Sequence, residues 1–325
     1  MNAASLKCGS RASNRGRCPV RKAKKFVSGF VSILGRPNAG KSTLINALVG
    51  SKVAIVSPKP QTTRQTVQAV VSTSKSQVVF LDTPGVHEGN LLVHRRMMDQ
   101  VRQGLQERDL LLWMADATLP LDSREKAALA LVANSKTPVF LVLNKIDRIR
   151  NKQQLLPLIE EFAKVATFQE SIPISALKGE GLDQLMRHIV NLMPAGPQYF
   201  PPDFLTDQPE RYLAGELIRE KILYATRQEV PHSVAVLVEQ WEEKTRLTRI
   251  AAAIYVDRDT HKRIIIGSGG DMLKKIGTLA RQEMESLFGR KIFLELFVKV
   301  QPKWRDSPDF LNELDWRYMA GGQEK

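Results

Sequence analysis

The 325-residue chain is long enough for two domains of about 100–200 residues each, and it can bury a hydrophobic core without disulfide bonds. It is 43% hydrophobic and 25% charged, and no apolar run approaches the ~18 residues that span a bilayer, which excludes an integral membrane protein. The net charge of +14 points to an anionic partner such as nucleic acid or acidic lipid.

The positive charge is unevenly distributed. Residues 1–25 hold eight basic residues and no acidic one, residues 26–200 carry +6, and residues 201–325 sum to zero. Within this last part, Lys244–Arg305 carries +8 between acidic flanks, which predicts a confined basic groove. Residues 1–25 are predicted to form a solvated basic arm. Their composition is also that of an organellar transit peptide, but they have no amphipathic apolar face.

Cysteine usage favours a reducing compartment. Cys8 and Cys18 both lie in the arm, and the rest of the chain has none. Two cysteines without a nearby histidine cannot complete a four-ligand zinc site, so we interpret them as incidental. No apolar stretch of 7–15 residues precedes residue 26, which argues against a secretory signal.

Short apolar runs alternate with helical periods in the first part of the chain. They predict strands at Phe30–Leu34, Val78–Leu81, Leu110–Ala115, Val139–Leu143 and Ile172–Ile174. The intervening segments are long enough for crossover helices, which predicts an α/β domain with a mostly parallel sheet at residues 26–197. An amphipathic helix over Leu182–Met193 closes it at Pro194, and a proline-rich linker follows at residues 198–209.

The sequence after the linker predicts a smaller α+β domain at residues 210–305, followed by a tail at residues 306–325. Its expected elements are a helix at Leu213–Thr226, strands at Ser233–Val238 and Thr248–Val256, a helix at Asp271–Phe288 and a strand at Ile292–Val300.

A phosphate-binding motif follows the first predicted strand. The pattern Gly-x4-Gly-Lys-Ser is satisfied by Gly35, Arg36, Pro37, Asn38, Ala39, Gly40, Lys41 and Ser42. Its backbone N–H groups and the N-terminus of the next helix, with Thr43 in the first turn, can point at phosphate oxygens. Lys41 can neutralise the β and γ phosphates, and Ser42 can ligate Mg²⁺. A plain glycine turn before a helix is the alternative, which the eight-residue match disfavours.

Three more motifs stand at the ends of predicted strands. They are Asp82-Thr83-Pro84-Gly85, Asn144-Lys145-Ile146-Asp147 and Ser175-Ala176-Leu177. We expect Asp82 to hold Mg²⁺ through water and the Gly85 N–H to sense the γ phosphate. The Asp147 carboxylate can accept two hydrogen bonds from guanine, whereas adenine offers no matching donors, and a backbone N–H of the Ser175 loop can reach guanine O6. With the P-loop, these motifs resemble the GTPase domains of the translation-factor superclass. ATP use, as in a P-loop kinase, is disfavoured.

A switch segment that orders around the γ phosphate is expected between the P-loop and Asp82. Residues 57–64 are the candidate, and we prefer Thr63 to Thr62 as the second hydroxyl ligand of Mg²⁺. Threonine pairs are also common in plain loops, so the position of this pair is what distinguishes it.

Val86 follows Gly85 at the place where the best-known GTPases carry a glutamine that orients water. The sequence is similar to GTPases with a hydrophobic residue there. That resemblance implies that Asn38 ligates a K⁺ ion, which stabilises charge at the β–γ bridge in place of an arginine finger. Alternatively, Asn38 only caps the loop through a backbone hydrogen bond. Lys41, Asn38, Thr63 and Gly85 are thus the expected catalytic residues.

In the second domain, a Gly-x-x-Gly loop precedes the long helix. Such a loop lets the backbone approach a nucleic-acid strand, beside walls that hold about four unpaired bases. The region resembles a KH domain with the type II element order, although Ser268 and Gly269 stand where KH loops usually carry a cation. A hairpin or helix cap is the alternative, and Trp304 is either an extra stacking site or packed under the domain edge. The expected RNA-binding residues are Lys262, Arg263, Ile266, Gly267, Ser268, Gly269, Gly270, Lys274 and Lys275.

Further motifs narrow the resemblance. They are Pro-Gln-Thr-Thr-Arg at 60–64, Ile-Arg-Glu-Lys at 218–221, Val-Pro-His-Ser at 230–233 and Ile-Ile-Gly-Ser-Gly-Gly at 265–270. The chain resembles the Era family of bacterial ribosome-assembly GTPases, and only the arm lies outside the match. This implies GTP and GDP as ligands and KH binding near the 3′ end of 16S rRNA during small ribosomal subunit biogenesis. GTP would set the binding-competent state, and hydrolysis would favour release.

The resemblance also implies a monomer in the cytoplasm that associates peripherally with the cytoplasmic membrane, which the arm would suit electrostatically. An alternative is an RNA-binding assembly chaperone whose P-loop binds nucleotide structurally, with negligible turnover. A tRNA-modifying GTPase is disfavoured because those proteins carry further catalytic domains.

Overall fold

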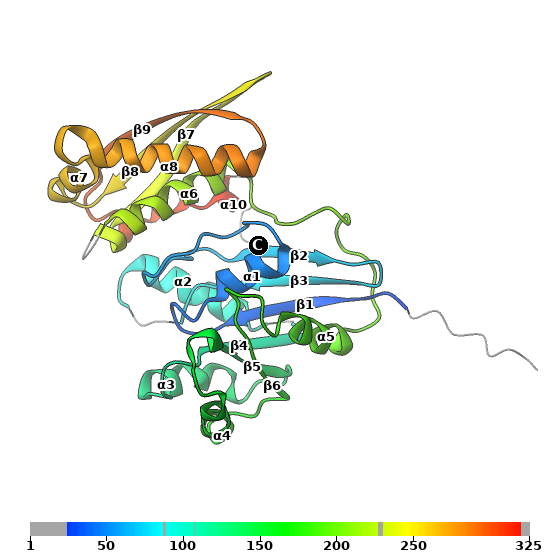
Figure 1. The fold of residues 1–325 in the computed structure, drawn as a ribbon. Helices are drawn as coiled ribbons and strands as arrows, with labels where there is room; N and C mark the ends of the chain where they lie inside the picture. The colour runs from blue at the N-terminus through cyan, green and yellow to red at the C-terminus, as the bar shows by residue number, and fades with distance from the viewer. Residues whose placement is uncertain (1–24, 87–88, 107, 227–229, 320–325) are drawn as a thin grey trace, which may run out of the picture.

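The computed structural model describes residues 25–86, 89–106, 108–226 and 230–319. The arm, apart from Lys25, and the last six residues of the predicted tail lie outside the described residues. The described chain forms two sheets, each covered by helices, with the second sheet above the first in Figure 1. Within the described residues, no helix is both long enough and apolar enough to cross a membrane.

The first domain contains a six-stranded sheet in the order β2-β3-β1-β4-β5-β6. Its strands are β1 Val27–Leu34, β2 Val67–Ser72, β3 Ser76–Asp82, β4 Leu110–Asp116, β5 Val139–Asn144 and β6 Glu170–Pro173. Its helices are α1 Lys41–Val49, α2 Leu92–Gln103, α3 Ser123–Ala133, α4 Leu155–Ala163 and α5 Leu182–Leu192. All neighbouring strands pair in parallel except β2, which is antiparallel to β3. The parallel strands therefore bring the loops at their carboxyl ends to one edge.

Two hydrophobic layers hold these helices on opposite faces of the sheet. Leu44 of α1 and Leu185 of α5 belong to one layer, and Leu129 of α3 and Phe162 of α4 belong to the other. Because both faces are covered, β4 and β5 are buried almost throughout, and this explains why their sequences read as continuous apolar runs.

The edge strand β2 was not predicted. Its sequence mixes apolar residues with Gln68 and Ser72, and only part of it is buried, so it lacks the apolar run of a central strand. The segment at residues 198–209 covers this edge, since the Val70 N–H donates to the Leu205 carbonyl at 2.9 Å. The region that the sequence suggests as a linker is thus packed against the sheet.

The second domain runs in the order α6, β7, β8, α7, α8, β9, which is the order expected from the sequence except for α7, a helix that was not predicted. The elements are α6 Glu210–Ala225, β7 Val234–Lys244, β8 Leu247–Val256, α7 Asp259–Ile266, α8 Asp271–Phe288 and β9 Lys291–Val300. β8 is antiparallel to β7 and parallel to β9. Apolar residues of α6 and α8 pack on the sheet in one core. In Figure 1 both helices lie on the side that faces the first domain.

The described part of the predicted tail, residues 306–319, contains two short helices, α9 Pro308–Glu313 and α10 Trp316–Met319. They join the domains, because Phe310 shares a buried cluster with Met97 of α2 and with Trp304. Trp304 is fully buried and donates from Nε1 to the Ser233 carbonyl at 3.0 Å. A base-stacking role for Trp304 is therefore wrong, and the packing alternative is correct.

Candidate functional site

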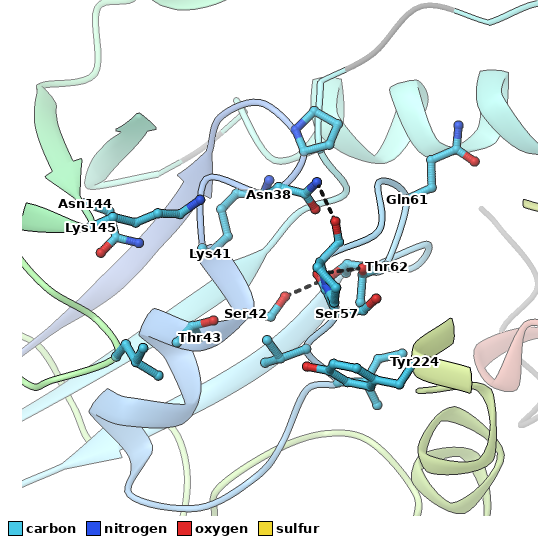
Figure 2. A pocket seen from close by; sticks show the side chains of 18 of the residues that line it. Asn38, Lys41, Ser42, Thr43, Ser57, Gln61, Thr62, Asn144, Lys145 and Tyr224 are labelled. Atoms are coloured by element: carbon cyan, nitrogen blue, oxygen red, sulfur yellow. Dashed lines mark hydrogen bonds between the residues drawn. The ribbon is translucent and has the colours of Figure 1, made fainter. Parts of the chain in front are cut away.

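A cavity of about 500 Å³ lies at the carboxyl edge of the first sheet (Figure 2). It is lined by residues of the P-loop, of the segment at residues 55–63, of the motif at residues 144–147 and of the second domain. The lining residues are Pro37, Asn38, Gly40, Lys41, Ser42, Thr43, Ile55, Val56, Ser57, Pro58, Gln61, Thr62, Thr63, Gly85, Asn144, Lys145, Asp147, Arg148, Leu177 and Tyr224. The motifs that the sequence places at separate strand ends thus meet in one cavity.

The P-loop conformation depends on glycine at two positions. Gly35 has φ 145°, and a Cβ there would lie 2.2 Å from the Met114 carbonyl oxygen. Gly40 has φ 101°, and its Cβ would lie 2.3 Å from Asn144 Nδ2. Any side chain would therefore push the loop away from β4 and β5 and would displace the N-terminus of α1 from the cavity.

Lys41 begins α1 and lies within the loop. Its Nζ donates to the carbonyl oxygens of Gly35 and Arg36, both at 3.1 Å. Burial lowers the pKa of Lys41 to about 8, although Asp82 and Glu125 oppose this shift. A phosphate anion in the cavity favours the charged ammonium, so binding and protonation of Lys41 support each other.

Three oxygen groups meet beside the P-loop, as expected for an Mg²⁺ site. Ser42 Oγ lies 2.6 Å from Asp82 Oδ2 and 2.9 Å from Thr63 Oγ1, and Thr63 Oγ1 lies 3.3 Å from Asp82 Oδ2. The Thr62 hydroxyl instead donates to the Lys59 carbonyl at 2.7 Å. Asp82 Oδ1 is buried without a hydrogen-bond partner among the described residues. Hard oxygen donors with spare acceptor capacity fit Mg²⁺.

Asn144 connects the P-loop to the loop that begins at Ser175. Its Nδ2 donates to the Ala39 carbonyl at 2.8 Å, and its Oδ1 accepts from the Ala176 N–H at 2.9 Å. Both ends of the amide are therefore used within the protein. Asn144 fixes the P-loop relative to the Ser175 loop, a role that its motif position alone does not reveal.

Asp147 is held in place by the same loop. Ser175 Oγ donates to Asp147 Oδ1 at 2.6 Å, while Lys145 Nζ pairs with Asp116 Oδ2 at 2.5 Å. Asp116, at the end of β4, was not predicted. Asp147 and the exposed Leu177 therefore line the same cavity as Lys41.

Several predicted residues stand behind the cavity wall. These are Gly35, Arg36, Ala39, Asp82, Thr83, Pro84, Ser175 and Ala176. Arg36 pairs with Asp122 at 2.9 Å, and the Thr83 hydroxyl donates to the Ile33 carbonyl at 2.9 Å. The side chains of Arg36 and Thr83 therefore support the loops, whereas the Asp82 carboxylate belongs to the oxygen cluster beside the P-loop.

Comparisons with known proteins identify the families of the two domains. Residues 30–145 match a family model described as a 50S ribosome-binding GTPase, and residues 229–305 match a KH domain model. GTPase Era of Rippkaea orientalis is 46% identical, with 90% of this chain and 93% of that protein covered. GTPase Era of Geotalea uraniireducens is also 46% identical, with 90% and 99% covered. This chain belongs to the Era family of GTPases.

Solved structures of Era share the whole arrangement. A variant of Aquifex aeolicus Era bound to GDP and aluminium fluoride is 42% identical with a TM-score of 0.87, covering 90% of this chain and 99% of that one. A complex of Era with MgGDPNP and nucleotides 1506–1542 of 16S ribosomal RNA matches with the same values. The predicted fold, a P-loop GTPase domain followed by a KH domain, is confirmed.

In this Era-family GTPase, the segment that follows α1 is held against the KH domain. Ile55 is part of the KH hydrophobic core. The Val56 N–H donates to Glu220 Oε1 at 2.8 Å, and Lys52 Nζ pairs with Glu220 Oε2 at 2.7 Å. Glu220 of α6 thus fixes the start of the segment that leads into the candidate switch.

Two arginines continue this contact along the candidate switch. The buried guanidinium of Arg219 donates to the Thr62 carbonyl. Arg64 Nη1 donates to the Val234 carbonyl at 2.8 Å, and its guanidinium lies 5.3 Å from the centre of the Trp304 ring. Thr63, which contacts Ser42 and Asp82, therefore lies between two residues that are bonded to the KH domain.

The KH loop has the backbone conformation that glycine favours. Gly267, Gly269 and Gly270 have φ values of 74°, 60° and 87°. A Cβ at Gly267 would lie 2.7 Å from Met272 Cβ, whereas a Cβ at Gly269 would have no atom of the described residues within 4 Å beyond Gly269 and its two chain neighbours. The tip of the loop is therefore open at Gly269.

A groove of about 380 Å³ runs from this loop between α8 and β9. It is lined by Gly270, Leu273, Lys274, Gly277, Thr278, Arg281, Leu294 and Leu296. Of the predicted RNA-binding cations, only Lys274 lines the groove. Lys262 and Arg263 lie on α7, and Lys275 is exposed on α8. Arg281, which was not predicted, also lines the groove, because it follows Lys274 by two helical turns and shares its face.

Proposed function

We propose that this Era-family GTPase is a switch that binds 16S rRNA near its 3′ end in the GTP state and assists small ribosomal subunit biogenesis. The bond between the candidate switch and the KH domain carries this proposal, because ordering at the γ phosphate then acts on the RNA-binding domain. The family's GTPase activity and the Era complex with a 16S rRNA fragment support it.

We assign a role at the bound nucleotide to individual side chains and backbone groups of the cavity. Ser42, Thr63 and, through water, Asp82 would hold Mg²⁺, which neutralises phosphate charge when bound. Lys41 neutralises the β and γ phosphates, and the Gly85 N–H senses the γ phosphate. The Era complex with MgGDPNP supports this assignment of the metal.

In the KH domain, the backbone of Gly267–Gly270 approaches the RNA strand and the α8–β9 groove takes unpaired bases. Lys274 and Arg281 place positive charge at the groove. Lys262, Arg263 and Lys275 stay predicted phosphate contacts outside it. Peripheral membrane association and a monomeric state likewise stay predictions.

The experiment that tests the function measures binding of a 3′-terminal 16S rRNA fragment in the GDPNP and GDP states, together with single-turnover GTP hydrolysis. Tighter RNA binding with GDPNP supports the switch. Equal binding in both states with no hydrolysis supports the alternative, a chaperone that binds nucleotide structurally.

Substitution of Arg219 by lysine is expected to weaken the coupling between nucleotide and RNA. The Arg219 guanidinium contacts both Glu216, through Nε at 2.7 Å, and the Thr62 carbonyl. Lysine keeps the positive charge beside Glu216, but its single ammonium group cannot reach both partners as the planar guanidinium does. We expect the ratio of RNA dissociation constants in the GDP and GDPNP states to fall by about threefold or more.

The matched control for this variant is Arg211→Lys on the same helix. Among the described residues, Arg211 donates only to carbonyls of its own domain, Val238 at 2.6 Å and Glu239 at 2.8 Å. Its substitution should leave the ratio unchanged. An unchanged ratio in the Arg219 variant would show that coupling does not pass through this contact.

GTP hydrolysis is expected to be faster in K⁺ than in Na⁺ at equal ionic strength, by about tenfold or more, because a cation at the β–γ bridge stabilises the charge that develops there. Asn38 Nδ2 donates to the Pro58 carbonyl at 3.0 Å, which leaves the amide oxygen to face a cation. The N–H of Val86 donates to the Gly35 carbonyl at 3.1 Å, and its apolar side chain cannot orient water. Equal single-turnover rates in the two salts would refute K⁺ ligation by Asn38 and would leave it only the hydrogen bond to Pro58.

A further inference from the structure

Tyr224, near the end of α6, is a KH-domain side chain that lines the nucleotide cavity. Figure 2 shows its ring reaching from α6 toward the side of α1 that carries Ser42 and Thr43. In sequence, most of the first domain separates it from the P-loop, and none of the sequence motifs includes it.

The two ends of the cavity show where Tyr224 lies along it. Lys41 marks the phosphate end, and Asp147 marks the base end. The pentose of a nucleotide joins these two groups and must lie between them. Tyr224 lines a second hollow together with Thr43, which follows the P-loop, and Leu177, which borders the base end. It therefore stands on the wall beside the middle of the cavity.

The side chain is free to contact a ligand. Tyr224 is 58% exposed, and its hydroxyl has no hydrogen-bond partner among the described residues. A phenol can donate to, or accept from, a ribose hydroxyl, and the ring offers an apolar face to the sugar carbons.

The helix that carries Tyr224 is fixed to the GTPase domain one turn earlier. Glu220 binds Lys52 Nζ and the Val56 N–H, both on the segment that leaves α1. The distance from Tyr224 to the cavity therefore depends on how α6 docks on this segment. A rearrangement of the two domains would add or remove the contact.

We propose that Tyr224 of the KH domain binds the ribose of the guanine nucleotide through its hydroxyl and ring, so that nucleotide affinity reports directly on domain arrangement. The proposal rests on guanine-nucleotide binding at the cavity, and wild-type affinities for GDP and GDPNP are measured first to establish that binding independently.

The test compares Tyr224→Phe and Tyr224→Ala with the wild-type full chain by calorimetric titration with GDP, GDPNP and their dideoxyribose analogues. With at least one nucleotide, Tyr224→Phe should lower affinity by roughly three- to tenfold, which corresponds to one hydrogen bond. It should bind the dideoxy analogue as the wild type does. Tyr224→Ala should lower affinity further, since it also removes the ring.

Tyr318→Ala is the matched control, because Tyr318 is 55% exposed on α10 and does not line the cavity. Its affinities should equal those of the wild type. The proposal is overturned if both Tyr224 variants bind GDP and GDPNP like the wild type. It is also overturned if Tyr224→Phe weakens ribose and dideoxyribose nucleotides equally, since the hydroxyl then acts on the protein and not on the sugar.

Discussion

Substitution of Asp147 by asparagine is expected to change the preferred nucleotide from GTP to xanthosine triphosphate. In the proposed function the carboxylate would accept hydrogen bonds from guanine N1 and the exocyclic amine, whereas a carboxamide would place an N–H opposite that amine. Xanthine carries an oxygen there and can accept from the new N–H. Sites built to hydrogen-bond a substrate reject mismatched analogues by ~10⁴ or more, so GTP affinity should fall by at least about 100-fold.

The measurement is competitive binding of GTP and xanthosine triphosphate, with Ser175→Ala as the control. Ser175 Oγ holds Asp147 Oδ1 at 2.6 Å, so its removal frees the carboxylate without changing its acceptor pattern. This control should weaken both nucleotides slightly and keep the preference for GTP. An unchanged preference in the Asp147 variant would refute its base-reading role.

Substitution of Gly269 by aspartate is expected to abolish RNA binding while leaving GTP binding intact. A negative charge at the open tip of the KH loop would face the phosphate backbone that approaches there. The fold should tolerate it, because beyond its two chain neighbours no atom of the described residues lies within 4 Å of the new Cβ, and aspartate can adopt the φ of 60°. We expect RNA affinity to fall by about 100-fold or more in filter-binding measurements at fixed salt.

Gly289→Asp provides a matched control at the other end of α8. Gly289 has φ 66° and equally open surroundings, so the variant carries the same charge and the same backbone demand away from the loop. It should bind RNA like the wild type. Loss of both GTP and RNA binding in the Gly269 variant would indicate a folding defect instead.

Local patterns in the sequence already determined most of the elements. The helix expected at Asp271–Phe288 is present with the same bounds, because its apolar residues repeat with the period of a helix that buries one face. The buried strands β4 and β5 are likewise visible as apolar runs. α7 was missed because Ile264, Ile265 and Ile266 form a β-branched run, yet packing places only Ile265 in the core.

The sequence also identified the P-loop, the Asp147 motif and the KH loop, since each is a contiguous segment whose glycines and side chains act at fixed spacing. The contacts that bring these segments together in space were determined by the tertiary structure. Arg219 and Thr62 are 157 residues apart, and Asn144 and Ala39 are 105 apart. Tyr224 reaches the nucleotide cavity only because α6 docks beside α1. Such contacts depend on how finished elements pack, which local propensity and spacing do not encode.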